Sequence, residues 1–304
     1  MTDHPLLLQK KCGFDSQIIS STRLRFVRRL KFSCLLVLLF CFNTTLIADE
    51  ARARAAMSNP QNHLVAVFTS KGAFYIELFN GRAPRTVTHF VALVSGTANF
   101  PSSDLQIRYY DQSSFHTVIP GLALYAGSPS VSRFGLQPPL ISTEIDGVAL
   151  GLDTRPLLDN TGEVDRSFAL STRKDFEQQV LAPLYAAAGI ESAQALSNNA
   201  ERMMQRLQQL SVLDALSNLG HRFSSGLDTQ PIIQGTVALL PTTPGEIGAE
   251  FVISMVPSPW LDGRATPIGN VVDGLSVINE IGSMKVSPDD DPSLATTIYS
   301  MRIL

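Results

Sequence analysis

Short apolar runs that alternate with polar residues occur in two separate parts of the chain, and they restrict the fold more than any other feature. The stretch 64–79 contains AFYIELF, in which Phe74, Ile76 and Leu78 alternate with Tyr75 and Glu77. This is the pattern of a strand buried on one face. A Lys-Gly pair just before this run fits a hairpin turn. Further short apolar runs lie at 115–119, 122–126, 235–240, 250–255 and 296–304. Many short strands separated by turns favour a closed barrel or a sandwich.

Two amphipathic helices are predicted among these strands. PRTVTHFVALVSG has Pro84 where a helix begins and Gly96 where it ends, and Val87 and Phe90 fall on one face. The second helix is predicted at about 274–283, where apolar residues recur with helical spacing. Each β-rich part of the sequence therefore has one helix to cover it.

The stretch 150–225 has a different character and predicts two or three helices. Thr172 followed by Asp175 resembles a capping box, which would begin a helix at RKDFEQQVLA. Pro183 must end or kink that helix, because proline lacks the N–H that an interior helical position needs. We therefore expect an all-α insertion between the two β-rich segments.

The last helix of this stretch is predicted from an N-cap at Asn199 to a C-cap at Gly220. Met203, Leu207 and Leu210 form an apolar stripe along it, continued by a further leucine. Such a stripe is typical of a helix that packs against the body of its own protein. The alternative is a docking face for a protein partner.

The N-terminal 48 residues differ from the rest in charge and in cysteine content. They hold seven basic and two acidic residues, whereas 49–304 holds 17 basic and 25 acidic residues. The cysteines of the chain are Cys12, Cys34 and Cys41. A basic cluster followed by the apolar run 32–48 predicts a secretory signal peptide over 1–48, with a polar linker over 49–61. We expect a secreted, periplasmic protein, or a membrane-anchored one if the segment is not cleaved.

Other common chemistries lack their sequence signatures. The five histidines show no metal-ligand spacing, and no cysteine follows residue 48, so no metal site is expected. The sequence contains no Walker glycine-lysine pattern and no G-x-G-x-x-G, so no cofactor is expected. The acidic balance of 49–304, without a basic stripe, argues against nucleic acid as a partner.

Three sequence blocks resemble one known family. They are RAPRTVTHFVALVSG, YYDQSSFHTVIPGLALYAGSP and GAEFVISMVPSPWLDGRATPIGNVVDGLSVINEI. In this order they are similar to the cyclophilin-type peptidyl-prolyl cis-trans isomerases, or rotamases. The resemblance covers 62–149 and 226–304 and implies a closed, eight-stranded antiparallel barrel capped by two helices, with 150–225 inserted. It also implies a protein-folding activity on X-Pro bonds, with proline-containing peptides or unfolded exported proteins as partners.

The resemblance implies that the catalytic position is Thr117. An X-Pro bond rotates over a barrier of about 18–20 kcal/mol, and its twisted nitrogen accepts a hydrogen bond. The family supplies the donor from an arginine after a Phe-His pair, and this chain has Thr117 there. Because a hydroxyl brings no charge and reaches less far, we expect weak activity.

The resemblance also implies the positions that would bind the peptide. They are Phe115, His116, Leu122, Tyr125, Glu250, Val252, Trp260 and Leu261. Phe115, His116, Trp260 and Leu261 keep the family residue type. The others are substituted, as are Ala123, Ala265 and the stretch Leu240-Pro241-Thr242.

Some of these residues also have purely structural interpretations. Trp260 fits a packing role as well as a ligand contact, and His116 fits a structural histidine with its hydrogen bonds satisfied. Glu250 fits a solvated carboxylate at the rim of a site.

The substitutions leave two hypotheses for the function. The first is a secreted isomerase of low activity, and the alternative is a non-catalytic peptide-binding or scaffold module on the same barrel. An arginine from elsewhere, such as Arg108 or Arg133, would restore the missing charge if it reached the site.

Overall fold

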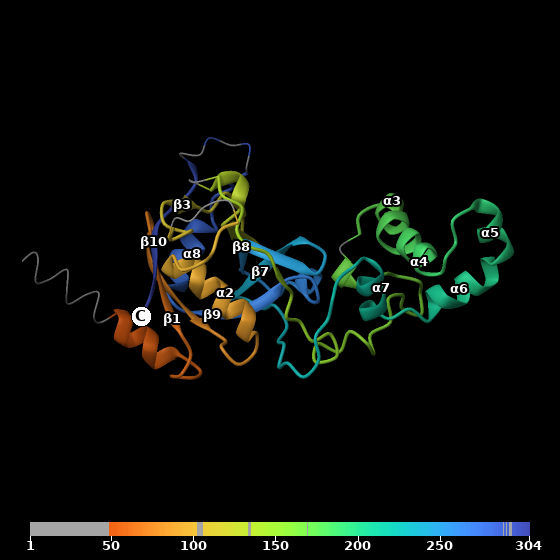
Figure 1. Cartoon of the computed structure of the whole chain (residues 1–304), viewed down its shortest axis with the longest axis horizontal. Coiled ribbons are helices and arrows are strands. Elements are labelled where there is room, and N and C mark those ends of the chain that lie inside the picture. The colour runs from red at the N-terminus through yellow and green to blue at the C-terminus, as the bar shows by residue number, and fades with distance from the viewer. Residues whose placement is uncertain are drawn as a thin grey trace, which may run out of the picture. The chain divides into compact units, whose positions relative to one another are not determined.

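The computed structural model describes residues 49–101, 106–132, 135–168, 170–287, 289, 291 and 294–304. The predicted leader over 1–48 and the candidate Arg133 lie outside the described residues. Residues 52–304 form one structural unit, whose strands and helices are labelled in Figure 1. In the described part of the chain, no helix has the length and apolar character needed to cross a membrane.

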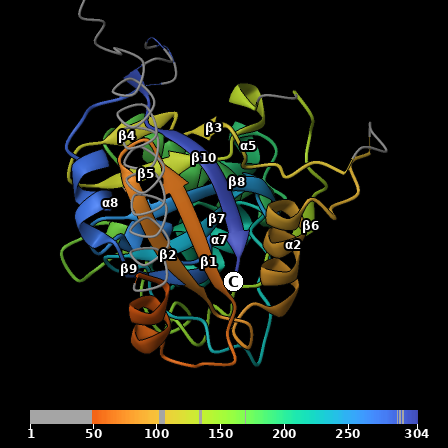
Figure 2. The same ribbon diagram turned by 90° about the vertical axis from the view of Figure 1, so that its left-hand side faces the viewer.

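One antiparallel sheet contains ten strands. They are β1 (Leu64–Thr69), β2 (Gly72–Leu78), β3 (Ser113–Ser114), β4 (Thr117–Ile119), β5 (Ala123–Ala126), β6 (Ile141–Ser142), β7 (Thr236–Thr243), β8 (Glu246–Ser254), β9 (Thr266–Asp273) and β10 (Thr297–Ile303). Their order is β3-β10-β1-β2-β9-β7-β8-β5-β4, and β6 pairs with β8 beside this path. Figure 2 shows β1 between β2 and β10, as the strand pairing requires.

The expected closed, eight-stranded barrel is corrected to a curled ten-stranded sheet. The two ends of the described path are β3 and β4, and no ladder pairs them with each other. Only Phe115 and His116 separate these strands in the chain. One bent segment therefore serves both edges of the sheet, pairing with β10 before the bend and with β5 after it. β3 and β4 pair with different strands and not with each other, so the sheet curls round without a closing ladder between them.

Helices α2 (Pro84–Ser95) and α8 (Leu275–Ile281) pack on this sheet. The predictions of both helices are confirmed to within one or two residues at each end. Gly96 ends α2 with φ +78°, a left-handed conformation that glycine adopts without strain. The main hydrophobic core lies between these helices and the inner face of the sheet. Its largest fully buried side chains include Phe74, Phe90, Tyr110, Phe115 and Phe251.

The predicted linker is partly packed against the sheet. Ala53 is fully buried in a small cluster with Leu64, Ala66 and Tyr75. The carboxylate of Glu77 accepts hydrogen bonds from the backbone N–H of Ser58, at 2.8 Å, and from nearby residues. Burial of Ala53 and the hydrogen bonds to Glu77 therefore hold part of 49–61 against the sheet, although its polar composition is typical of a linker.

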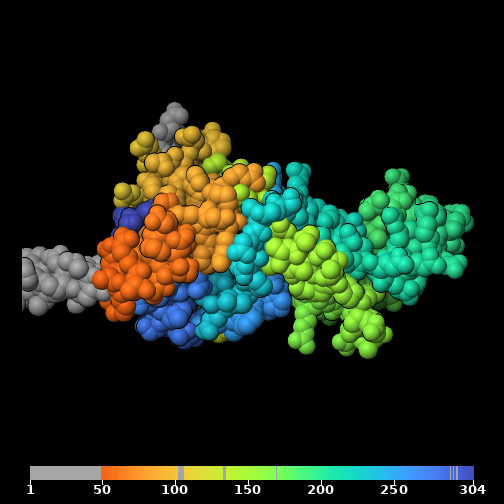
Figure 3. Space-filling model, turned by 90° about the horizontal axis from the view of Figure 1, so that it is seen from below, coloured from red at the N-terminus to blue at the C-terminus, as the bar shows by residue number. Residues whose placement is uncertain are grey.

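Helices also occupy much of 150–225. They are α3 (Arg173–Phe176), α4 (Ala182–Ala187), α5 (Ala193–Asn198), α6 (Ala200–Gln208) and α7 (Val212–Asn218), with a π-helical turn at Glu177–Leu181 and a 3₁₀ turn, η2, at Arg166–Phe168. All of them except α5 contribute residues to a hydrophobic cluster that is separate from the main core. The space-filling view shows these helices, in green, gathered together (Figure 3).

The predicted capping box is confirmed, and the predicted helix boundaries are only partly correct. The Thr172 hydroxyl accepts from the Asp175 N–H, and the Asp175 carboxylate accepts from the Thr172 N–H. Pro183 lies in the first turn of α4, where a proline needs no N–H. The single helix predicted from Asn199 to Gly220 is wrong, because it breaks into α6 and α7. Ser211 starts the second helix by accepting a hydrogen bond from a backbone N–H at 3.0 Å.

Gly127 provides a test of how closely the strands approach beside β5. Its φ is +84°, and a Cβ there would lie 2.5 Å from the Ala249 carbonyl oxygen and 2.8 Å from the Tyr110 ring. We expect Gly127→Ala to lower the free energy of unfolding by about 2–4 kcal/mol, because strain adds to overpacking. Urea denaturation measures this. The matched control is Gly121→Ala. Gly121 has a φ of +68°, but a Cβ there would meet no neighbouring atom, so the expected loss is only about 1 kcal/mol. Equal losses would contradict the predicted close approach.

Candidate functional site

A row of side chains crosses four neighbouring strands at Thr117, the position that the resemblance predicts to be catalytic. Thr117 on β4 pairs with Tyr125 on β5, which pairs with Val252 on β8, and Val252 pairs with Ala238 on β7. Residues that lie directly opposite in antiparallel strands point to the same face. Their neighbours in sequence, such as Leu124, belong to the inner core. The row therefore lies on the outer face of the sheet.

Thr117 is held by a buried histidine. Its hydroxyl oxygen lies 2.9 Å from His116 Nδ1. The other ring nitrogen, Nε2, lies 3.3 Å from Glu250 Oε1, which is within ion-pair distance although the atoms are not aligned for a hydrogen bond. A neutral ring with its proton on Nε2, facing the carboxylate, leaves Nδ1 as an acceptor. In that tautomer the Thr117 hydroxyl donates to His116, and only its lone pairs face a substrate.

Tyr125 supplies the second hydroxyl of the row. Burial raises the pKa of this phenol above its usual value, and the negative charge of Glu250 raises it further. The group therefore stays protonated and remains a hydrogen-bond donor at neutral pH. No hydrogen bond found among the described residues uses this hydroxyl, and the side chain is half-buried. Directly opposite Thr117, Tyr125 is the best-placed available donor at the site.

A floor of small side chains continues from the row. Ala123, Ala238, Val252 and Ala265 are each at most 1% exposed, and Ile232, which is 2% exposed, belongs to the same cluster. The residues packed over them are Leu122, Tyr125, Leu240 and Leu261. The predicted positions Leu122, Tyr125, Val252 and Leu261 are therefore brought together in one apolar cluster.

The structure does not bring every predicted residue to this surface. Phe115 is fully buried in the inner core, where its ring centroid lies 6.4 Å from that of Phe251. His116 is 8% exposed and acts through Thr117 rather than presenting a free ring. Phe115 is thus in a packing role, and His116 positions the row from beneath.

Trp260 faces a different part of the molecule. It lies on the 3₁₀ turn η4 (Pro259–Leu261) and is half-buried. It lines a cavity of about 630 Å³ whose other walls come from the segment before and within α3. Those residues are Glu163, Val164, Asp165, Arg166, Leu170, Ser171, Thr172, Arg173 and Phe176. Trp260 therefore shares its cavity with 163–176, and none of the row residues lines that cavity.

The edge that would pair with a peptide backbone is irregular. Pro241 lies within β7, where the register with β8 shifts on both of its sides. Proline offers no N–H to a ligand, and the shifts interrupt the even spacing that strand addition needs. The candidate Arg108 is placed elsewhere, because its side chain lies against Gly96 at the end of α2.

Sequence reasoning missed Ile232 and the role of Asp262. The Ile232 N–H donates to Asp262 Oδ1 at 2.9 Å in a buried hydrogen bond. Burial raises the pKa of Asp262 to about 6, and the nearby Asp165 raises it as well, whereas the Ile232 N–H and Arg155 lower it. An aspartate directly after the retained Trp-Leu pair was the available signal. Nothing in the local pattern singles out Ile232, since its role depends on residues that are distant in sequence.

No group of three His, Cys, Asp or Glu side chains capable of holding a metal ion occurs in the parts of the chain that the structure describes. The candidate site consists of the hydroxyls of Thr117 and Tyr125, the Glu250 carboxylate, the His116 imidazole and an apolar floor.

Comparison with known proteins assigns the family. The family model described as cyclophilin type peptidyl-prolyl cis-trans isomerase/CLD matches residues 64–303. The chain belongs to this family, as a divergent member.

Individual relatives are distant. A peptidyl-prolyl cis-trans isomerase-like 1 of Aspergillus niger is 25% identical over 240 residues, which is 79% of this chain and 94% of the relative. The protein of the same name from Neurospora crassa is 22% identical over 240 residues, covering 79% of this chain and 93% of the relative. A solved cyclophilin type isomerase of Cryptosporidium parvum is 15% identical, with a TM-score of 0.42 over 80% of this chain and 98% of that chain.

Asp262 gives a pH-dependent prediction for stability. Its folded pKa of about 6 lies above the ordinary value of 3.8, so the ionised form destabilises the fold as pH rises through this interval. We compare the free energy of unfolding of Asp262→Asn with that of the parent. We expect this difference to favour the variant by about 2–3 kcal/mol more at pH 7 than at pH 4. Urea denaturation at the two pH values measures the difference.

The matched control for this comparison is Asp153→Asn, at an exposed position. His221, whose pKa burial lowers to about 4, opposes Asp262 in the same pH interval. Its contribution cancels because each variant is compared with the parent at the same pH. A pH-independent difference for Asp262→Asn would contradict the raised pKa.

Proposed function

We propose that this protein is a cyclophilin-type peptidyl-prolyl cis-trans isomerase of low activity that acts on X-Pro bonds of exported polypeptides. The observation that carries the proposal is the pairing of Thr117 with Tyr125 on the outer sheet face. It puts a protonated phenol beside the position from which family members donate a hydrogen bond. Family membership supplies the reaction class, and the row supplies a donor for it.

The chemistry requires stabilisation of a twisted amide. As the X-Pro bond rotates, conjugation is lost and the nitrogen becomes a hydrogen-bond acceptor, at the top of a barrier of about 18–20 kcal/mol. The Tyr125 hydroxyl donates to that nitrogen, and Glu250 with His116 holds Thr117 alongside. A neutral donor is weaker than a guanidinium, and losing one preorganised donor typically costs about 10²–10³ in rate. Slow turnover follows from this substitution.

The cellular location belongs to the same proposal. A basic segment followed by an apolar run over 1–48 supports export through a signal peptide, and an uncleaved membrane anchor is the alternative. Cleavage after residue 48 would remove every cysteine, which suits an oxidising compartment such as the periplasm. Proline-containing, unfolded exported chains are the substrates that such a location offers.

A second candidate function is a non-catalytic peptide-binding or scaffold module. Two observations favour it: the Thr117 hydroxyl is engaged by His116, and the apolar floor beside it is covered. In this alternative the same face binds polypeptide without accelerating rotation.

We also propose that 150–225 is an insertion that provides a second surface. Its two ends meet, because the Ser224 N–H donates to the Ile145 carbonyl at 2.7 Å and the Gly226 N–H donates to Asp146 at 2.7 Å. A segment that starts and finishes at one point extends the chain without disturbing the sheet. Its own hydrophobic cluster supports the same view.

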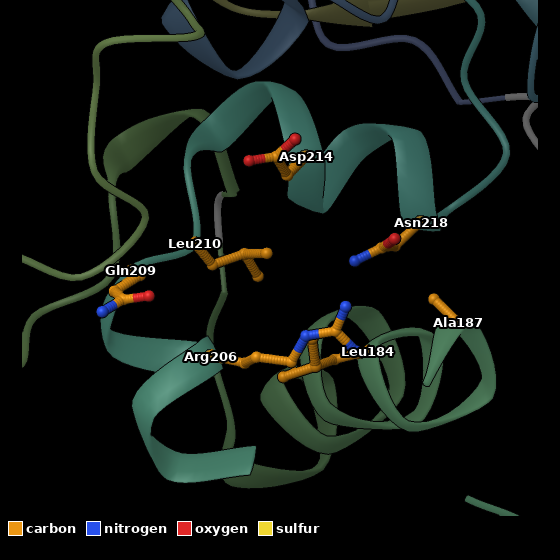
Figure 4. A pocket seen from close by; sticks show the side chains of 7 residues that line it. All are labelled: Leu184, Ala187, Arg206, Gln209, Leu210, Asp214 and Asn218. Atoms are coloured by element: carbon orange, nitrogen blue, oxygen red, sulfur yellow. The ribbon is translucent and has the colours of Figure 1, made fainter. Parts of the chain in front are cut away.

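A cavity of about 350 Å³ lies among the helices of this segment. The side chains of Arg206 and Asn218 point toward one another across it, beside Leu184 and Leu210 (Figure 4). Gln209 and Asp214 also line the cavity, so its walls mix apolar, charged and amide side chains. We propose that this surface binds a polypeptide partner.

The isomerase proposal is tested by three variants and one assay. Exchange NMR on a short X-Pro peptide measures the rate of isomerisation with the purified protein. Tyr125→Phe removes the proposed donor, so the catalysed rate should fall to background. Thr117→Arg supplies a guanidinium, so the rate should rise by about 10²-fold. Tyr299→Phe, an exposed tyrosine on β10, is the matched control and should leave the rate unchanged.

Parent rates at background, with no gain in Thr117→Arg, would rule out the isomerase. Peptide binding without turnover would then support the module. A parent rate above background that Tyr125→Phe leaves intact would show that the donor lies elsewhere.

A further inference from the structure

The apolar floor of the candidate site is covered by a side chain from another part of the same chain. Ala123, Ala238, Val252 and Ala265 have little volume of their own, yet none is more than 1% exposed. Ile232 belongs to this cluster and is itself only 2% exposed. A buried isoleucine from outside the sheet thus packs with these small side chains, and Leu122, Tyr125, Leu240 and Leu261 pack around them.

Hydrogen bonds on both sides of the residue hold it there. The Ile232 N–H donates to Asp262 at 2.9 Å, and its carbonyl accepts from the Ser258 N–H at 2.8 Å. The next residue, Ile233, donates its N–H to Thr236 Oγ1 at 3.1 Å. These partners fix the backbone of the segment from both neighbouring loops.

Only the central residue of this segment turns inward. Pro231 is exposed, and Ile233 is 55% exposed, whereas Ile232 between them is buried. An exposed isoleucine next to a buried one shows that orientation, rather than hydrophobicity alone, places Ile232 on the floor. The segment therefore presents a single side chain to the site.

We propose that Ile232 is a built-in occupant of the apolar site beside Tyr125, and that it determines specificity by excluding the proline ring of a substrate. The inference deepens the proposed function and rests on it. The isoleucine side chain has four carbons and a proline ring has three methylenes, so Ile232 is large enough to fill the apolar volume that the ring would need. A peptide proline must displace Ile232 before its amide can reach Tyr125. The low activity then has a second cause, independent of the missing guanidinium.

Truncation of Ile232 provides the test. The variant Ile232→Ala leaves an apolar cavity, and such cavities bind small apolar groups. Val252 and Leu261 belong to the cluster, so chemical-shift changes of their methyl groups during an NMR titration report binding. The probe is N-acetyl-Ala-Pro-amide, with N-acetyl-Ala-Ala-amide as the control peptide. We expect Ile232→Ala to bind the proline peptide roughly 10- to 100-fold more tightly than the parent, with no change for the alanine peptide.

Two further variants separate this effect from general loosening of the fold. Ile232→Val removes a single methyl group, so a small gain in the same direction is expected. Ile268→Ala makes the same truncation in the inner core, where Ile268 is fully buried, and should bind no better than the parent. Equal gains from Ile232→Ala and Ile268→Ala, or no gain from Ile232→Ala in a folded protein, would overturn the proposal.

A measurement on the parent protein tests the occupancy directly if a variant fails to fold. Methyl NMR should show nuclear Overhauser contacts between the δ1 methyl of Ile232 and the methyls of Val252 and Ala265. Absence of those contacts would overturn the proposal whatever the variants do.

The outcomes also distinguish this proposal from the isomerase function. Tighter proline binding by Ile232→Ala without turnover in any variant would leave Ile232 as the occupant and rule out the isomerase. Turnover by the parent, without tighter proline binding by Ile232→Ala, would support the isomerase and rule out Ile232 as the occupant.

Discussion

The bend at Phe115 and His116 is the constraint on which the rest of the structure depends. The Phe115 ring is fully buried against Phe74 and Phe251, with ring centroids 6.4 Å apart in both pairs. With that ring anchored, the segment that pairs with β10 through β3 pairs with β5 through β4 only two residues later. The bend breaks the strand alternation, so that Val118 also points into the core while Thr117 does not. The curl of the sheet and the outward direction of Thr117 therefore have one cause.

On the outer face beside the bend, side-chain volume and charge both differ from the pattern of the family. Small side chains line the floor, and Ile232 supplies the volume that they lack. Burial, and then the charge of Glu250, raise the pKa of the Tyr125 phenol, so a neutral hydroxyl lies opposite Thr117. These substitutions act together. Filling an apolar site from within the chain stabilises the fold through burial, at the expense of room for a ligand.

The sequence predicted the local elements better than the way they come together. Alternation predicted the run that contains Phe74, and the Pro84 and Gly96 pair predicted the ends of α2, because both depend on neighbouring residues. The break between α6 and α7 was missed, since Ser211 as an N-cap was hidden inside a continuous apolar stripe. The strand count was wrong because short strands such as β3 form only through partners distant in sequence.

The site shows the same division. The resemblance indicated Thr117, Tyr125 and Val252 as site residues, and the structure places them on one face because they pair across neighbouring strands. It could not place Ile232, which reaches the floor only through a hydrogen bond to Asp262. It also could not separate Trp260 from the row, because that depends on residues from 163–176 that line the Trp260 cavity.

Asp262 connects the two surfaces of the molecule. Its carboxylate holds the Ile232 N–H at 2.9 Å, and its pKa is raised mainly by burial and further by the nearby charge of Asp165. Asp165 directly precedes the turn η2, and Phe168 of that turn lies under the Arg264 guanidinium at 4.9 Å. The helical stretch and the apolar site are thus supported by the same loop. A change in the position of this loop would alter the hold on Ile232 and the cavity around Trp260 together, so the two surfaces are not independent.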